Sequence, residues 1–301
     1  MREPNLHTPY DGSSPPFTIG LSQLDPSQWL DLDQNLGSYL DEKLNLYRTL
    51  PDKVLVEDEG SRVAQSEVLN LVQAHVLERF PSLYVRDGNV MHIADRHTLK
   101  LDDVTLSPIA IAGLLVQEDL VLMRKSSEGW KLVAASLCFP SAWNLRDKFK
   151  RPLSEIHAPV PGFNAGTRNA ALIERMFDKL RVEQPVLRWN WSLHDDMRLY
   201  HPDSHAGGTR RFGDGDLHGH VNLRLERQTL RKLPVSGDIL FTIRIYLDPL
   251  EVLERHPDGR TLARAIDDQL AAMSDAEAEY KGIAGERARL SARLQTIMGR
   301  G

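Results

Sequence analysis

The sequence predicts an α+β protein, with an antiparallel sheet between a helical first part and a helical last part. Apolar residues recur at helical spacing in two early segments and again from Pro249 onward, whereas the middle of the chain alternates with period two. Strands here follow one another through turns rather than helical crossovers, and no GxGxxG or P-loop motif occurs. These observations argue against a doubly wound sheet.

The individual elements follow from local pattern and turn chemistry. Helices are expected over 29–48 and 61–80, and Pro81 ends the second because proline lacks the amide proton a helix needs. Strands over 115–124 and 130–139 flank the turn residues Ser126–Gly129 and predict a β-hairpin. The later elements are an irregular proline-rich segment at 140–163 with a short helix near 143–149, a helix at 167–182, a strand at 186–193, a polar loop at 195–219, and strands at 220–229 and 239–247 joined by a turn at 234–237.

Composition and charge exclude several classes of protein. The 301 residues include a single cysteine, Cys138, so the chain cannot form an internal disulfide, a four-thiolate zinc site or its own iron–sulfur cluster. The net charge of -5, without a dense basic stripe, argues against nucleic acid. The longest apolar run, Ile109 to Val116, is too short to span a membrane, and the N-terminus lacks the apolar core of a secretory signal. We therefore expect a cytoplasmic protein.

Two single residues are candidates for metal or nucleophilic chemistry. Cys138 ends a predicted strand; it is either a buried apolar residue or a thiolate ligand or nucleophile, and no basic neighbour in sequence lowers its pKa. His157 lies close to Pro159 and Pro161, which stiffen the backbone and so suit a preorganised metal ligand. A structural hydrogen-bonding role for His157 stays open.

The strand from Leu223 to Thr229 carries charges where a central sheet is expected. Period two places Arg224, Glu226 and Gln228 on one face and Arg227 on the other. Buried charges need partners, so these side chains either contact a bound anion or substrate or form internal ion pairs.

Five histidines surround the polar loop, but their spacing does not suit a zinc site. Pro202 and the nearby glycines make a helical pair improbable, and no HExxH motif accompanies them. We expect solvent-exposed loop histidines. They are His194, His201, His205, His218 and His220.

Several segments together resemble one known family. In order, they are CFPSAW, RPLSEIHAPVPGFN, RWNWSL and RLERQTLRKLPVSGDILFTIRIYLDPL, with an early PFTIGLSQLDPSQWLDLD and a late Tyr280-Lys281-Gly282. This chain resembles the haem-dependent oxidative N-demethylase alpha-subunit family over roughly residues 16–297. The resemblance implies one haem-binding domain over 16–297, preceded by a flexible segment at 1–15, with a PAS-like fold that binds haem b.

The resemblance also implies a reaction and its partners. It implies the O2-dependent removal of a methyl group from a secondary amine such as dimethylamine, a monooxygenase-type reaction that gives a primary amine and formaldehyde. Electrons would come from NADPH through separate reductase subunits that carry flavin and a [2Fe–2S] centre. The alternative is a PAS-type haem sensor or a small-ligand-binding module without turnover.

Residue roles follow from the matching positions. His157 is the expected axial iron ligand, with Cys138 as its rival, because a thiolate favours O–O cleavage. Glu226 and Arg224 are the expected catalytic pair: the carboxylate attracts the amine or relays a proton, and the guanidinium orients it. Arg227 on the opposite face serves a propionate or an ion pair. Trp189 and Trp191 either wall the haem or substrate, or belong to the core.

Overall fold

The computed structural model describes residues 7–14, 17–94, 96–164, 166–203 and 211–299. Within these residues a seven-stranded sheet has the order β1-β8-β9-β10-β6-β7-β2, and each strand runs antiparallel to its neighbours. Its strands are β1 (Ser22–Gln23), β2 (Leu55–Glu57), β6 (Asp119–Ser126), β7 (Gly129–Ser136), β8 (Val186–His194), β9 (Asn222–Lys232) and β10 (Ile239–Pro249). The predicted α+β class with an antiparallel sheet is confirmed.

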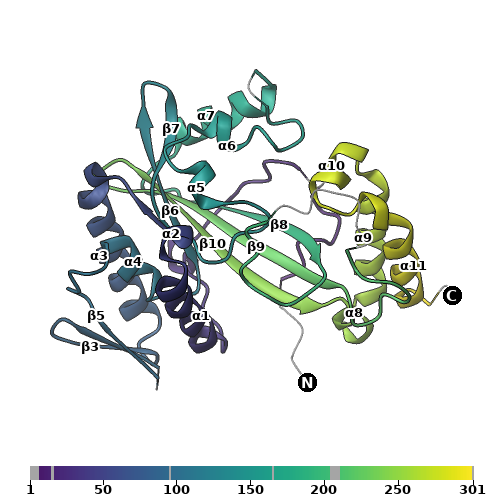
Figure 1. Ribbon diagram of the computed structural model, residues 1–301, viewed down its shortest axis with the longest axis horizontal. Helices are drawn as coiled ribbons and strands as arrows, with labels where there is room; N and C mark the ends of the chain where they lie inside the picture. Colours follow the sequence, from purple (N-terminus) through teal and green to yellow (C-terminus); the bar gives the residue numbers. More distant parts are fainter. Residues whose placement is uncertain (1–6, 15–16, 95, 165, 204–210, 300–301) are drawn as a thin grey trace.

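Helices lie on two sides of this sheet (Figure 1). At one side are α1 (Leu36–Thr49), α2 (Pro51–Val54), α3 (Arg62–Arg79) and α4 (Pro108–Gly113), with a second sheet of β3 (Tyr84–Asp87), β4 (Val90–Ile93) and β5 (His97–Lys100). At the other side are α8 (Val252–Arg255), α9 (Gly259–Ala272), α10 (Asp275–Tyr280) and α11 (Arg287–Ile297). Between them, α5 (Leu145–Lys148), α6 (Leu153–Ile156) and α7 (Arg168–Lys179) follow the β6–β7 hairpin; short 3-10 turns occupy Pro26–Gln28, Glu59–Ser61 and Ala284–Glu286.

Most predicted elements form close to where the periodicity places them. The hairpin, α3, α7 and the three long strands β8, β9 and β10 are all present. The helix expected over 29–48 is wrong in its first turns, because α1 begins only at Leu36. Asp31 and Asp33 instead donate their backbone amides to the side chains of Glu118 and Gln117, respectively. Tertiary hydrogen bonds thus replace those of a helix.

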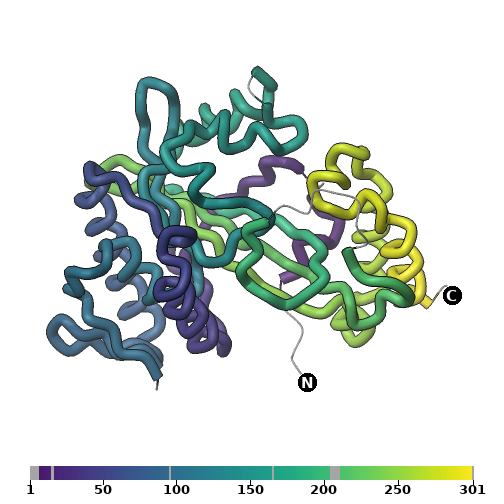
Figure 2. The backbone as a smooth tube through the Cα atoms, in the orientation of Figure 1, coloured from purple at the N-terminus to yellow at the C-terminus, as the bar shows by residue number. Residues whose placement is uncertain are grey.

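The segment before α1 packs along the large sheet (Figure 2). Ser22 and Gln23 pair with β8, and the Tyr10 side chain is buried against Trp191 with ring centroids 6.4 Å apart. The domain boundary expected at residue 16 stays a prediction. Among the described residues, no helix is both long enough and apolar enough to cross a membrane.

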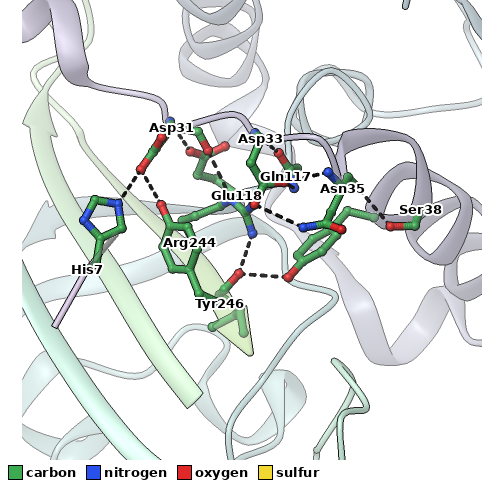
Figure 3. A network of polar contacts seen from close by, with 11 residues as sticks. His7, Asp31, Asp33, Asn35, Ser38, Gln117, Glu118, Arg244 and Tyr246 are labelled. Carbon is green, nitrogen blue, oxygen red and sulfur yellow. Dashed lines mark hydrogen bonds and ion pairs between the residues drawn. The ribbon is translucent and has the colours of Figure 1, made fainter. Parts of the chain in front are cut away.

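A buried arginine joins the segment before α1 to the centre of the sheet (Figure 3). Arg244 on β10 is fully buried, and its guanidinium lies 4.5 Å from the ring centroids of both Tyr39 and Tyr246. Its Nη2 is 2.9 Å from Asp33 Oδ2, and its Nε donates to the Asp31 carbonyl. The acidic and aromatic partners therefore hold this buried cation in place.

The buried contacts around Arg244 change the pKa values of the nearby carboxyl groups of Glu118 and Asp31. Burial raises the pKa of Glu118, which the charge of Arg244 opposes. Burial also acts to raise the pKa of Asp31, but hydrogen bonds from His7 and Tyr246 outweigh it and lower that pKa to about 2. Removing the arginine would leave Glu118 and Asp33 without their principal counter-charge.

We expect Arg244→Met to lower the free energy of unfolding by about 3–5 kcal/mol, because removing one partner of a buried ion pair leaves the other uncompensated. Urea denaturation at neutral pH measures this change. Arg62→Met removes an exposed ion pair with Glu57 and should cost less than about 1 kcal/mol. Equal losses in the two variants would contradict a structural role specific to Arg244.

Candidate functional site

A large cavity opens over one face of the central sheet. Its volume is about 1160 Å³, at the upper limit of small-molecule and cofactor sites. Strands β6, β7, β8, β9 and β10 supply one wall, and the irregular segment from Phe139 to Phe163 together with α7 supplies another. The lining is completed by residues from two segments that are far apart in the sequence, Phe17 to Leu21 and Ala276 to Lys281. Much of the lining is apolar, so polar groups within it are informative.

His157 lines this cavity at the end of α6. Its Nδ1 lies 3.1 Å from the carbonyl oxygen of Leu153, which can only accept a hydrogen bond. The imidazole proton must therefore sit on Nδ1 in the neutral ring, and Nε2 keeps its lone pair. Burial lowers the pKa of His157 to about 4, and the charge of Arg188 acts in the same direction. The ring is neutral at physiological pH, as a metal ligand must be.

Glu226 faces the same cavity from the centre of β9. Its side chain is almost fully buried, and its Oε2 accepts hydrogen bonds from Asn190 Nδ2 at 3.2 Å and from Gln228 Nε2 at 2.7 Å. Both amides come from the same sheet face as Glu226, because Asn190 is its cross-strand partner and Gln228 lies two residues further along β9. The carboxylate is thus oriented by neutral donors, with Oε1 available for another contact.

Arg224 shares this face with Glu226, as the alternation predicts, but it does not line the cavity. It is completely buried, and its guanidinium donates to the carbonyl oxygens of Phe139, Pro140 and Leu199. The structure therefore places Arg224 behind the wall, where it holds the Phe139–Pro140 segment. It does not bring the guanidinium to the cavity beside Glu226.

Arg227, Trp189 and Trp191 lie on the opposite side of the sheet from the cavity lining. Strand pairing puts Trp189 directly across from Arg227, so the alternation that brings Asn190 to the cavity takes these side chains away from it. Arg227 donates to the carbonyl oxygens of Gln28 and Trp29, and Trp189 stacks near His7 and Tyr246. These residues join the sheet to the N-terminal segment.

Cys138 is fully buried in the apolar core and does not line the cavity. Burial raises its pKa well above the usual range, and the charge of Asp119 adds to this effect. The thiolate form that a ligand or nucleophile requires is therefore disfavoured at neutral pH. Its backbone amide donates to Asp119 Oδ1, a contact that fixes the end of the β7 segment.

The loop histidines divide into two groups. His218 and His220 are exposed, as expected, and His205 lies outside the described residues. The expectation is wrong for His194 and His201, which are buried with their ring centroids 4.8 Å apart. The reason is local pairing, because His201 contacts Asp196 at 2.9 Å and His194 contacts Ser192 at 3.1 Å.

Among the polar residues of the cavity to which the sequence pattern assigned no role are Arg188, Tyr280 and Lys281, although the last two belong to a segment that carries the family resemblance. Arg188 alternates with the conspicuous tryptophans on β8, so the period-two pattern of that strand contained the signal. Tyr280 ends α10 and Lys281 follows it, 37 and 38 residues after Ile243, the last sheet residue of the lining, so their proximity to β8 and β9 is visible only in three dimensions.

Fold and site together define an α+β protein with a cofactor-sized cavity whose lining includes the neutral imidazole of His157, a second histidine, His194, and the oriented carboxylate of Glu226. The chain belongs to the family described as haem-dependent oxidative N-demethylase, alpha subunit-like, whose family model matches residues 20–290. That description indicates haem dependence and an oxidative enzyme-like family, and the words alpha subunit imply further subunits.

The residues present fit a haem. The cavity is large and lined by many apolar side chains, and the Nε2 lone pair of His157 is not used by the hydrogen bond at Nδ1. In the described part of the chain, no cluster of three or more His, Cys, Asp or Glu side chains is arranged to hold a bare metal ion. A haem iron does not need such a cluster, because its macrocycle supplies most of the ligands.

The lowered pKa of His157 predicts a pH-dependent contribution to stability. An unfolded histidine titrates near 6.5, so between pH of about 6.5 and 4 the unfolded chain binds a proton that the folded protein excludes. As the pH falls through this window, wild-type protein should lose roughly 2–3 kcal/mol of stability relative to His157→Gln. Urea unfolding of both proteins at pH 7 and pH 4 measures this difference.

The exposed His92 provides the matched control, since His92→Gln should follow the wild-type pH curve. A constant difference between wild type and His157→Gln at both pH values would show that the imidazole titrates normally.

Proposed function

We propose that this protein is the haem-binding catalytic subunit of an oxidative N-demethylase. The observation that carries the proposal is His157, a neutral imidazole held through Nδ1 so that Nε2 is available at a cofactor-sized cavity. Because the chain belongs to a family described as haem-dependent, we take the group that Nε2 would bind to be a haem iron. The proposed axial ligand is His157 rather than Cys138, because the cysteine is buried outside the cavity lining with a raised pKa.

We also propose that the central sheet is PAS-like and that the bound group is haem b. Numbered along the chain, the five longest strands of the large sheet (β6, β7, β8, β9 and β10) lie in the spatial order 2-1-5-4-3. This order, with the cavity on one sheet face, supports the proposal. When bound, the haem supplies a redox-active iron for the reduction of dioxygen.

The proposed reaction removes one methyl group from a small secondary amine such as dimethylamine. The amine, O2, two electrons and two protons give a primary amine, formaldehyde and water. At neutral pH such an amine is mostly an ammonium ion, and the buried Glu226 offers Oε1 to bind it and to accept its N–H proton. The Asn190 and Gln228 amides keep the carboxylate in one orientation, and the apolar wall excludes water.

The electrons need a source outside this chain. With one cysteine, the chain cannot ligate an iron–sulfur cluster by itself. We propose that NADPH supplies them through partner subunits that carry flavin and a [2Fe–2S] centre, in keeping with the alpha-subunit description of the family.

We expect the purified protein to bind one haem with a strong Soret absorption. His157→Ala should lose the ligand field of the bound haem and weaken binding by at least about tenfold, because axial coordination is lost. Cys138→Ser is the control and should keep the wild-type spectrum. Absorption and CO-difference spectra after haem titration measure both effects. Unchanged spectra in the His157→Ala variant would show that His157 is not the iron ligand.

We expect Glu226→Gln to keep its haem but lose roughly 10²–10⁴-fold in amine turnover, because the neutral amide cannot accept the substrate proton. Formaldehyde release with reconstituted reductase measures this loss. Glu279→Gln changes an exposed carboxylate of the cavity rim and should retain activity. Haem binding without formaldehyde release in wild-type protein supplied with reductase would favour the alternative of a haem sensor.

A further inference from the structure

Among the described residues, Arg188 and Lys281 are cationic side chains of the cavity that, like Lys148, lack an acidic partner at contact distance. Arg188 comes from β8 and Lys281 from the residue after α10, and both line the cavity. Within the described parts of the chain, neither forms an ion pair with a carboxylate at 4 Å or less, in contrast to arginines such as Arg124 and Arg293, which do. Both are half-buried, where an uncompensated charge is unfavourable.

Arg188 has unused donors. Its Nη2 donates to the carbonyl oxygen of Thr18 at 3.3 Å, a long contact, whereas its Nε is buried and has no hydrogen-bond partner. A guanidinium presents two parallel donors that match the two oxygens of a carboxylate. Buried Nε atoms without a partner also occur at Arg224, Arg231, Arg287 and Arg293, but of these arginines only Arg188 lines the cavity, where a ligand can reach the free donor.

Lys281 is held at the same end of the cavity. Its ammonium donates to the carbonyl oxygen of Trp191 at 2.7 Å and lies 5.2 Å and 5.6 Å from the ring centroids of Phe17 and Trp191. Burial lowers its pKa to about 8, which Glu226 opposes and Arg188 reinforces. Lys281 lies over Phe17 and Arg188 donates to the carbonyl oxygen of the next residue, Thr18, so the two cations occupy the same end of the cavity.

Glu226 does not neutralise both charges. It is the acidic group whose charge acts most strongly on both Arg188 and Lys281, but its Oε2 is occupied by the two amides. Glu277 also acts on Lys281, but its Oε2 accepts hydrogen bonds from Ser274, and Glu279 of the cavity rim is exposed. A carboxylate ligand inside the cavity would pair directly with both cations.

We propose that Arg188 and Lys281 form a carboxylate-binding clamp inside the cavity. The carboxylate has two possible sources: a propionate of the haem, or the substrate itself if that substrate is an N-methyl amino acid whose ammonium contacts Glu226. The second source would make the substrate a zwitterion rather than a simple dialkylamine. The identity of the bound carboxylate rests on the proposed function, whereas the positions of Arg188 and Lys281 do not.

The first arm of the test compares haem with haem dimethyl ester, which has no free carboxylates. If the clamp holds a propionate, wild-type protein should bind the ester about tenfold or more weakly than haem, and Arg188→Gln and Lys281→Met should bind haem as weakly as ester. Ester affinity should be equal in all three proteins, which excludes a merely misfolded cavity. Arg181→Gln removes an exposed charge just before β8 and should bind like wild type.

The second arm titrates haem-loaded protein with N-methylglycine and with dimethylamine and follows binding by calorimetry. If the clamp holds a substrate carboxylate, Arg188→Gln should weaken N-methylglycine binding by about tenfold or more and leave dimethylamine binding unchanged. Variants that match wild type in both arms would overturn the clamp.

Failure of the proposed function has a different signature, namely wild-type protein that binds no haem. In that case N-methylglycine is titrated into the protein as purified. Binding that Arg188→Gln abolishes would retain the clamp as the site of a haem-free binding protein, and absence of binding in wild type would overturn it.

Discussion

The arrangement of the whole molecule depends on the burial of a full positive charge in the middle of the sheet. Arg244 is inaccessible to water, and it is tolerated there because Tyr39, Tyr246 and Asp33 surround it. Those partners come from α1, from the segment before α1 and from β10 itself, so one side chain joins the N-terminal part to the sheet (Figure 3). Tyr39 in turn packs edge-on against Phe139, a residue of the cavity wall. Electrostatic compensation on one side of the sheet thereby helps to position the cavity on the other.

The cavity wall is held by a second set of buried charges. Asp119 accepts the backbone amides of Cys138 and Phe139, while Arg224 donates to the carbonyl oxygens of Phe139 and Pro140. Asp119 therefore binds the backbone N–H groups of this short segment, and Arg224 binds its backbone carbonyl groups. This explains why a strongly charged strand such as β9 occurs in a sheet interior: its charges satisfy irregular backbone that no neighbouring strand can pair.

Local patterns predicted much of the fold, and they failed where distant contacts decide. The hairpin of β6 and β7 and the strands β9 and β10 carry strong period-two signals; β9 and β10 pair without interruption, whereas the β6–β7 register shifts at an irregularity between Leu122 and Met123. The small sheet of β3, β4 and β5 was not predicted, since its strands are four residues long and interrupted by charged residues. The local pattern extends the predicted helix over residues 29–35, whereas the hydrogen bonds that Asp31 and Asp33 form with Glu118 and Gln117 connect distant parts of the chain.

The site divides in the same manner. Glu226 and His157 could be singled out because a buried strand with charges and a histidine between prolines are unusual within a few residues of sequence. Both line the cavity. Arg188 and Lys281 could not be singled out from the sequence. An arginine beside two tryptophans and a lysine after a helix are ordinary in sequence, and only the fold places both side chains in one cavity. Only the three-dimensional arrangement exposes their missing partners.

The lining of the cavity extends from Phe17 to Lys281, nearly the full length of the chain. On the ribosome the two ends of that lining emerge far apart in time, and the sheet wall must wait for β10 before it exists. A nascent chain therefore has no pocket in which to retain a cofactor, and cofactor capture follows synthesis instead of guiding it. Until residues 276–281 are in place, one part of the cavity lining is missing and the apolar side chains of residues 139–163 in that lining face an incomplete cavity.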